Sequence, residues 1–182
     1  IEVQTIVELF TGSRQNSIGY FHQDASEENF KTNVGKYRYV HISTHGFMNE
    51  EKPELSARAL SQPRDSSYSD DGFLYSSEVY NLDLNADLVV LSSCESGMGK
   101  LARGEGLMAL TRGFLYAGAN NVVVSLWKVF DASTGQLMVA FYRGVVSGKS
   151  YSAALREAKL KMIEDEFTAF PVLWSSFILI GK

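Results

Sequence analysis

Short apolar segments alternate along the chain with segments of helical periodicity. Four segments rich in Val, Ile, Leu and aromatic residues predict strands, at residues 37–43, 87–93, 121–129 and 177–180. The second of these centres on a continuous apolar run, which is typical of a strand buried on both faces of a parallel sheet. A weaker strand candidate lies before residue 22, where the pattern is ambiguous.

Helices are predicted where apolar residues recur three or four positions apart. Such segments lie at about residues 26–34, 107–118, 137–148 and 151–162. Ser26 and Ser150 stand where N-caps are expected, and Gly148 ends the third helix. Because strands alternate with helices, we predict an α/β protein, a three-layer α/β/α sandwich with a mostly parallel central sheet.

One stretch interrupts this alternation. Residues 49–71 contain two of the three prolines together with many serines and charges, and we predict a long exposed loop there. Such a loop is either functional or a solvated insertion without function.

Length and composition narrow the class of protein. A chain of 182 residues is expected to form a single domain over 1–182, with 1–20 as a lead-in from an upstream region. Hydrophobic residues at 45% and charged residues at 21% exclude wholesale disorder. The single cysteine excludes a disulfide framework and a Cys-based zinc site.

Charge and targeting signals bear on partners and location. The net charge is −4 and there is no block of Lys and Arg, so we expect no nucleic-acid partner and no anionic membrane surface. No apolar run approaches the roughly 20 residues of a membrane helix. With one cysteine and no signal peptide, we expect a reducing, cytoplasmic location. The chain does not begin with Met, and we expect it to be part of a longer protein.

Two predicted strands run into reactive side chains. His45 follows the first strand in Ser-Thr-His-Gly, and Cys94 follows the second in Ser-Ser-Cys-Glu-Ser-Gly. If these strands are parallel neighbours, imidazole and thiol share the edge of the sheet where ligands collect. A thiolate nucleophile with a neighbouring imidazole performs acyl transfer. The N–H groups of Gly46 and Cys94 would then form an oxyanion hole.

Other chemistries fit the residues less well. Taken singly, a lone cysteine or a strand-end histidine is more often structural. His41 and His45 are too far apart along a strand, at roughly 13 Å, to share a metal ion, so we predict no metal site and treat His41 as a satisfied core group. The glycines after Cys94 lack the Ser or Thr of a phosphate-binding loop, and no serine-hydrolase elbow occurs.

Several motifs share the order and spacing of a known family. His45 precedes Cys94 by 49 residues, close to the spacing of about 50 in caspases. The other motifs are residues 41–46 (HISTHG), 91–97 (LSSCESG), 104–107 (GEGL), 114–119 (FLYAGA), 124–127 (VSLW) with Asp131, and 174–181 (WSSFILIG). Together they resemble the CHAT family of caspase-like domains, which are commonly attached to tetratricopeptide repeats.

The resemblance implies a caspase–haemoglobinase fold and a cysteine endopeptidase without a cofactor. His45 would be the general acid/base and Cys94 the nucleophile. The segment from Ser125 to Asp131 would line the substrate cleft, where a peptide pairs with the strand edge and Trp127 walls the first pocket. Asp131 resembles an acidic residue that receives a basic side chain before the cleaved bond in separase-like relatives. Alternatively, Asp131 caps the helix that starts near Ala132.

The implied partners are a protein or peptide substrate and an upstream tetratricopeptide-repeat region or regulatory protein. Cleavage after a basic residue is the finer expectation. The alternative from another class is a catalytically silent caspase-like scaffold that binds a peptide along the edge of residues 125–129.

Overall fold

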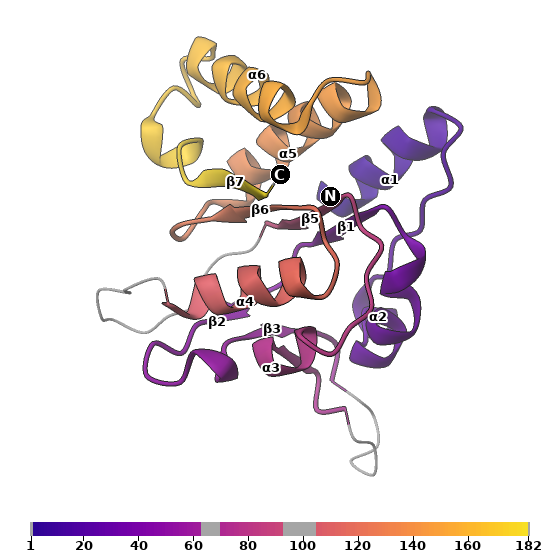
Figure 1. Ribbon diagram of the computed structural model, residues 1–182. Coiled ribbons are helices and arrows are strands. Elements are labelled where there is room, and N and C mark those ends of the chain that lie inside the picture. Colours follow the sequence, from indigo (N-terminus) through magenta and orange to yellow (C-terminus); the bar gives the residue numbers. More distant parts are fainter. Residues whose placement is uncertain (1, 63–69, 93–104, 182) are drawn as a thin grey trace.

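A four-stranded sheet forms the centre of the protein (Figure 1). The computed structural model describes residues 2–62, 70–92 and 105–181. The strands are β1 (Tyr39–Ile42), β5 (Leu88–Leu91), β6 (Asn121–Ser125) and β7 (Phe177–Gly181), in the spatial order β1-β5-β6-β7. β1, β5 and β6 are parallel, and β7 is antiparallel to β6, which confirms the prediction of a mostly parallel sheet.

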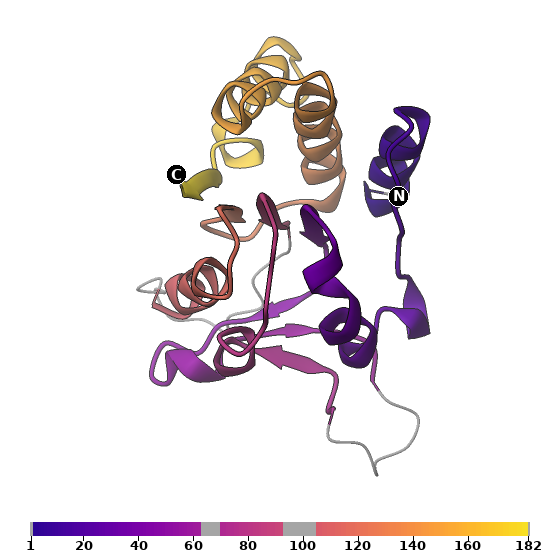
Figure 2. The ribbon, with the colours of Figure 1, turned by 45° about the vertical axis from the view of Figure 1, so that its right-hand side comes forward.

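Helices cover both faces of this sheet, which confirms the predicted α/β/α layering (Figure 2). One face carries α1 (Glu2–Gly12), α5 (Asp131–Val146) and α6 (Tyr151–Glu164). The other carries α2 (Glu27–Asn33), α3 (Ser76–Val79) and α4 (Glu105–Tyr116). Ser26 and Ser150 are N-caps as predicted, because their side chains accept hydrogen bonds from the backbone N–H groups of Asn29 and Ala153. Short 3₁₀ turns lie at His22–Asp24, Val34–Lys36, Pro53–Leu55 and Pro171–Leu173.

The apolar runs of the central strands supply both cores. Leu88 and Val90 of β5 face the layer of α1, α5 and α6. Val89 and Leu91 of the same strand face the layer of α4. All four side chains are fully buried, as expected for a central strand of a parallel sheet.

Two expectations about the first half of the chain are wrong. The weak strand candidate before residue 22 is instead the helix α1, in which Ile6 and Phe10 pack into the core at a helical spacing. The loop expected over residues 49–71 contains β3 (Ala57–Ala59), which joins β2 (Gly46–Phe47) and β4 (Phe73–Tyr75) in a small antiparallel sheet. These strands are too short to show a period of two in the sequence. Residues 63–69 lie outside the described residues.

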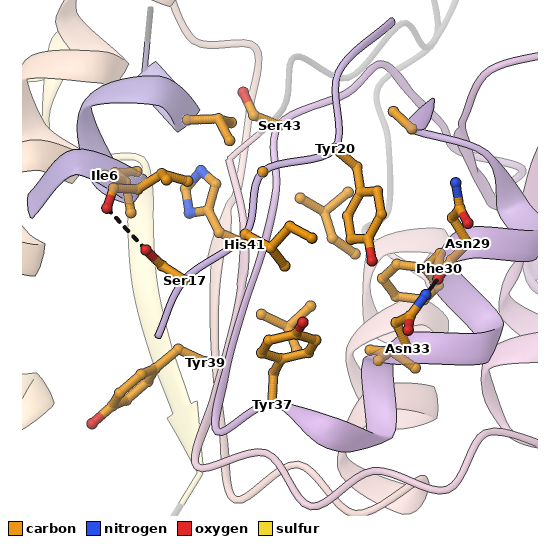
Figure 3. A pocket seen from close by; sticks show the side chains of 18 of the residues that line it. Ile6, Ser17, Tyr20, Asn29, Phe30, Asn33, Tyr37, Tyr39, His41 and Ser43 are labelled. Carbon is orange, nitrogen blue, oxygen red and sulfur yellow. Dashed lines mark hydrogen bonds between the residues drawn. The ribbon is translucent and has the colours of Figure 1, made fainter. Parts of the chain in front are cut away.

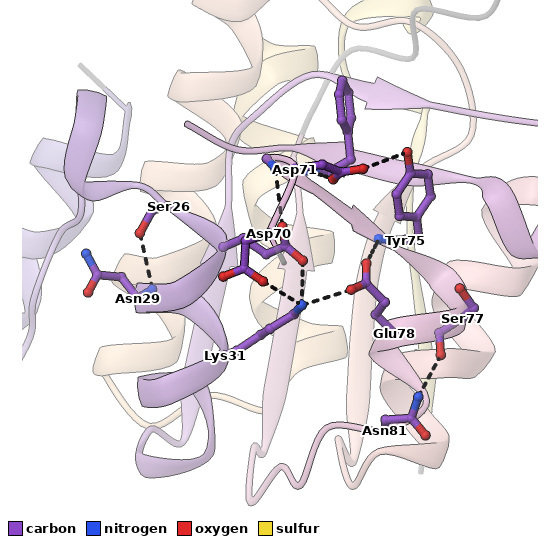
Figure 4. Close-up of polar contacts among 12 residues, drawn as sticks. Ser26, Asn29, Lys31, Asp70, Asp71, Tyr75, Ser77, Glu78 and Asn81 are labelled. Atoms are coloured by element: carbon purple, nitrogen blue, oxygen red, sulfur yellow. Dashed lines mark hydrogen bonds and ion pairs between the residues drawn. The ribbon is translucent and has the colours of Figure 1, made fainter. Parts of the chain in front are cut away.

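A cluster of charges attaches this small sheet to α2 (Figure 4). The Lys31 ammonium group lies 2.5 Å from Glu27 Oε1, 2.8 Å from Glu78 Oε1 and 3.3 Å from Asp70 Oδ1. Glu27 is 2% exposed, and its second oxygen accepts a hydrogen bond from the Gly72 N–H. These bonds raise the pKa of Lys31 although burial opposes them, so the ammonium group stays charged beside the buried carboxylate.

In the described part of the chain no helix is long and apolar enough to span a membrane.

Replacing Lys31 with Met should destabilise the protein, because it leaves Glu27 buried without its counter-ion. We expect Lys31→Met to lower the free energy of unfolding by about 2–3 kcal/mol. Lys161→Met is the matched control, because Lys161 also pairs with a glutamate four residues before it, but on the surface. That control should cost less than about 0.5 kcal/mol. Urea unfolding of both variants measures the difference, and equal losses would show that the Lys31 cluster does not contribute.

Candidate active site

β1 and β5 are parallel neighbours, which is the condition for His45 and Cys94 to share one edge of the sheet. Ile42 pairs in register with Leu91, and the Ser92 N–H donates to the Ile42 carbonyl at 3.1 Å. In the sequence, His45 follows Ile42 by three positions and Cys94 follows Leu91 by three. Cys94 itself lies outside the described residues, so the dyad stays a prediction.

His45 has an anchored backbone and an accessible side chain. It lies in the short connection between β1 and β2, and its carbonyl accepts a hydrogen bond from the Ala59 N–H of β3 at 2.8 Å. Its side chain is exposed to solvent. The imidazole can therefore meet a substrate while both sheets fix the chain on either side of it.

Gly46 is required by the close approach of a buried arginine. Arg58 is 1% exposed, and a Cβ atom on Gly46 would lie 2.7 Å from its Nη1. An arginine remains charged even when buried, so a fixed positive charge lies directly behind the residue after His45. Such a charge favours anionic groups in its neighbourhood. The sequence analysis missed Arg58, and the available signal was a charged residue between two alanines in a strand-like segment.

Ser125 is buried inside the sheet, and its backbone is paired with β7. It is the last residue of β6 and lies opposite Phe177, and the next N–H, of Leu126, donates to the Ser176 carbonyl at 2.9 Å. β7 covers one backbone edge of Ser125 and Leu126, so a peptide along residues 125–129 would have to pair with their other edge, and this pairing stays a prediction. The part of this segment that leaves the sheet begins at Trp127.

Trp127 lies on a partly apolar surface beyond the end of β6. Its indole N–H points to the Val172 carbonyl at 3.5 Å, so the ring is held against the segment before β7. Trp127 and Val172, which are both exposed, are called here the Trp127 surface; the exposed residues Leu126, Phe130 and Phe170 lie near them in the sequence. Exposed apolar groups of this kind mark sites of protein or ligand contact.

Asp131 is the first residue of α5 and does not cap it. Phe130 occupies the N-cap position and makes no side-chain capping bond, so the predicted N-cap role of Asp131 is wrong. The carboxylate is exposed at the helix N-terminus, where the helix dipole favours a negative charge. It lies four residues after Trp127, at the far end of the segment expected to line the cleft.

A cavity of about 710 Å³ lies on the other side of β1, between α1 and α2 (Figure 3). Its lining includes Tyr39, His41 and Ser43, and Figure 3 shows Ile6 on one side of His41 and Phe30 on the other. The predicted residues His45, Gly46, Ser125, Trp127 and Asp131 do not line it. The cavity is therefore separate from the predicted cleft.

A polar cluster lies between α1 and the ends of β1 and β5. The His41 Nε2 atom lies 3.0 Å from Glu2 Oε1 and 3.1 Å from Ser92 Oγ, and its Nδ1 lies 3.2 Å from the Tyr142 hydroxyl. Ser43 donates to Glu2 Oε2 at 3.1 Å. His41 is therefore a satisfied core group, as predicted, and no three potential metal ligands gather within the described residues.

Glu2 is ionised in this cluster. Burial alone would raise the pKa of Glu2, but hydrogen bonds from His41, Ser92 and Ser43 and the attraction of His41 together hold it below its ordinary range. Burial raises the pKa of Tyr142 well above its usual value, so this hydroxyl keeps its proton. The sequence analysis missed Glu2 because its partners lie about 40 to 140 residues away along the chain.

Comparisons with known proteins give one family and a pair of relatives. A family model described as CHAT domain matches residues 1–182. Tetratricopeptide repeat protein 28 of Mus musculus is 39% identical over 109 residues, and its namesake in Homo sapiens is 40% identical over 109 residues. Each match covers 60% of this chain and 4% of the relative, so the chain spans a small part of the length of these curated relatives.

The ionisation of Glu2 predicts a pH-dependent contribution to stability. Because its pKa is lowered in the folded state, the carboxylate stabilises the fold above its ordinary pKa of about 4.5, and this contribution is lost as the pH falls through the folded value. We expect Glu2→Gln to lower the free energy of unfolding by about 1–2 kcal/mol at neutral pH, with the loss shrinking under acid.

Urea unfolding at neutral pH and below about pH 4 would measure this change. Glu8→Gln is the control, because Glu8 is an exposed glutamate of the same helix whose carboxylate accepts a hydrogen bond from the nearby Gln4 side chain. A Glu2→Gln loss that stays constant with pH would contradict the prediction.

Proposed function

Because the chain belongs to the CHAT domain family, which is caspase-like and peptidase-related, we propose that it is a cysteine endopeptidase with a His45–Cys94 dyad. The observation that carries the proposal is the parallel register of β1 and β5, in which Ile42 lies opposite Leu91. Each strand is followed, three positions later in the sequence, by one member of the dyad. The exposed imidazole of His45 supports the proposal further.

The proposed reaction proceeds through a thioester. The Cys94 thiolate attacks the carbonyl carbon of the peptide bond, and a C–S bond forms. The protonated imidazole of His45 gives its proton to the amide nitrogen as the C–N bond breaks and the amine leaves. His45 then takes a proton from a water molecule, whose oxygen bonds to the thioester carbon. The C–S bond breaks, which releases the carboxylic acid and restores the Cys94 thiolate beside the protonated His45.

The N–H groups of Gly46 and Cys94 are the proposed donors to the oxyanion that forms at each attack. The buried guanidinium group of Arg58 behind Gly46 adds a positive charge on this side of the site.

We place the substrate residues that precede the cleaved bond over the Trp127 surface. Trp127 offers an aromatic wall, and the exposed carboxylate of Asp131 offers a partner for a basic side chain before that bond. This assignment makes the preferred substrate a protein segment with Arg or Lys at that position.

The names of the relatives suggest a partner within the same polypeptide. Both are tetratricopeptide repeat proteins, and we propose that an upstream repeat region delivers or regulates the substrate. A nucleophile that must remain a free thiol also fits the reducing environment of the cytoplasm.

A catalytically silent peptide-binding module is the second candidate, favoured by the exposed Trp127 surface. Such a module would bind the same peptides without cutting them. The two candidates differ in what happens to the peptide, so one measurement separates them.

Cys94→Ala should abolish cleavage, because the variant has no nucleophile. We expect wild type to cut members of a proteome-derived peptide library and to react with an active-site thiol probe, while Cys94→Ala does neither. Mass spectrometry of the library gives the cleavage sites. A folded wild type that binds peptides and leaves all of them intact, even with its repeat region present, would favour the silent module.

Asp131→Asn should weaken the preference for a basic residue. We expect kcat/KM for an Arg-containing peptide to fall by about 10- to 100-fold, because the charge-assisted pair is lost. A matched peptide with Gln in place of Arg should change less than about twofold. Equal effects on both peptides would exclude Asp131 from the pocket.

A further inference from the structure

We propose that Glu2 is a positioning residue for the dyad, because its carboxylate ties together the two chain segments that lead to His45 and Cys94. The inference rests on the proposed function. Glu2 lies on α1, a helix that carries no proposed catalytic group. The geometry of the dyad would therefore depend on the position of α1 against the sheet.

The geometry of the Glu2 cluster places one carboxylate between two strand ends. Oε2 accepts from Ser43 at 3.1 Å and Oε1 faces His41 Nε2 at 3.0 Å, both from the β1 side. Ser92, which directly follows β5, also hydrogen-bonds to this carboxylate and to His41. Ser43 precedes His45 by two positions, and Ser92 precedes Cys94 by two.

The donors and acceptors of the cluster fit one arrangement. An ionised carboxylate only accepts, so the His41 Nε2 must carry a hydrogen toward Glu2. Nδ1 then faces the Tyr142 hydroxyl, which can donate to the neutral ring or accept from the charged one. The groups that face Glu2 therefore come from β1, from the residue after β5 and, through His41, from α5.

This arrangement does more than fill space. The Glu2 and His41 side chains are 12% and 8% exposed, and burying a carboxylate costs solvation that an apolar group of the same shape would not. Hydrogen bonds from His41, Ser43 and Ser92 offset this cost of burying the carboxylate. These donors reach Glu2 together only when α1, β1 and the end of β5 are in their native positions. A buried polar group of this kind fixes geometry at the expense of stability.

The role of Glu2 should appear in kcat rather than in KM. Glu2 lies on α1, where it packs near Gly135 of α5, and it is not one of the residues that we propose to contact the substrate. Loosening the segments before His45 and Cys94 changes the approach of thiol to imidazole, and small misplacements of reacting groups cost large factors in rate. We expect Glu2→Gln to lower kcat about tenfold and to change KM less than twofold.

The test uses the single cysteine of the chain as its own probe. The rate of Cys94 alkylation by iodoacetamide is measured against pH in wild type, Glu2→Gln and Glu8→Gln, beside kcat and KM for the best peptide from the library. We expect the midpoint of the alkylation profile in Glu2→Gln to move up toward the value of about 8.5 for an ordinary thiol. Glu8→Gln should match wild type in every measurement.

Ser43→Ala and Ser92→Ala extend the test, because each removes one donor and leaves the carboxylate in place. We expect each to lower kcat about two- to fivefold, in the direction of Glu2→Gln. They decide the question if Glu2→Gln does not fold. Circular dichroism and an unfolding curve confirm that the compared variants are folded at the assay temperature.

The possible outcomes separate this inference from the proposed function. If wild type cuts no peptide but the alkylation profile still shifts in Glu2→Gln, the endopeptidase proposal fails and the positioning role stands. If wild type is active and the folded Glu2→Gln, Ser43→Ala and Ser92→Ala variants keep the kcat and alkylation profile of Glu8→Gln, the positioning role is overturned. A rise in KM as large as the fall in kcat, with an unshifted alkylation profile, would also overturn it.

Discussion

The rest of the structure depends on the burial of β5 between its parallel neighbours β1 and β6 and between two layers of helices. Its side chains alternate between the two cores, with Leu88 and Val90 on one face and Val89 and Leu91 on the other. A shift of one residue would exchange the two sets of side chains between cores of different shape, so the register with β1 is strongly specified. That register sets where the two segments after Ile42 and Leu91 leave the sheet. The chemistry proposed for this protein therefore begins with packing.

In this apolar surrounding, burying the carboxylate of Glu2 costs solvation free energy. The carboxylate lies beside the core that contains Phe10 and Tyr142, and leaving any one of its donors out would expose a buried charge to an apolar neighbour. Packing alone would hold α1 on the sheet with some freedom to slide, because apolar contacts are not directional. The hydrogen bonds of Glu2 to His41, to Ser43 after β1 and to Ser92 after β5 are directional, and they fix α1 in one position on the sheet.

The sequence predicted the parts of the fold that carry a local signal, and it missed those that arise from contacts between distant segments. The strands β5 and β6 are visible as continuous apolar runs, and Ser26 and Ser150 as caps, because each pattern is complete within a few residues. β2 and β3 have two and three residues, too few for any period. Arg58 and Glu2 look like ordinary charged residues until the fold buries them. Of the predicted site, the residue types and their spacing were readable, while the pairing of Ser125 with β7 was not.

The two sheets together explain why His45 is suited to its proposed role. Before it, Ile42 is held in the central sheet by β5, and after it, Gly46 is held in the small sheet opposite Arg58. The connection between them is short, and its carbonyl at His45 is bonded to β3, so the backbone has little freedom. His45 is nevertheless exposed to solvent. A rigid backbone with an accessible imidazole is the arrangement that allows a proton to be exchanged with a bound substrate without a prior rearrangement. The small sheet, which no local pattern predicts, is thus as much a part of the candidate site as β1, the strand that precedes His45.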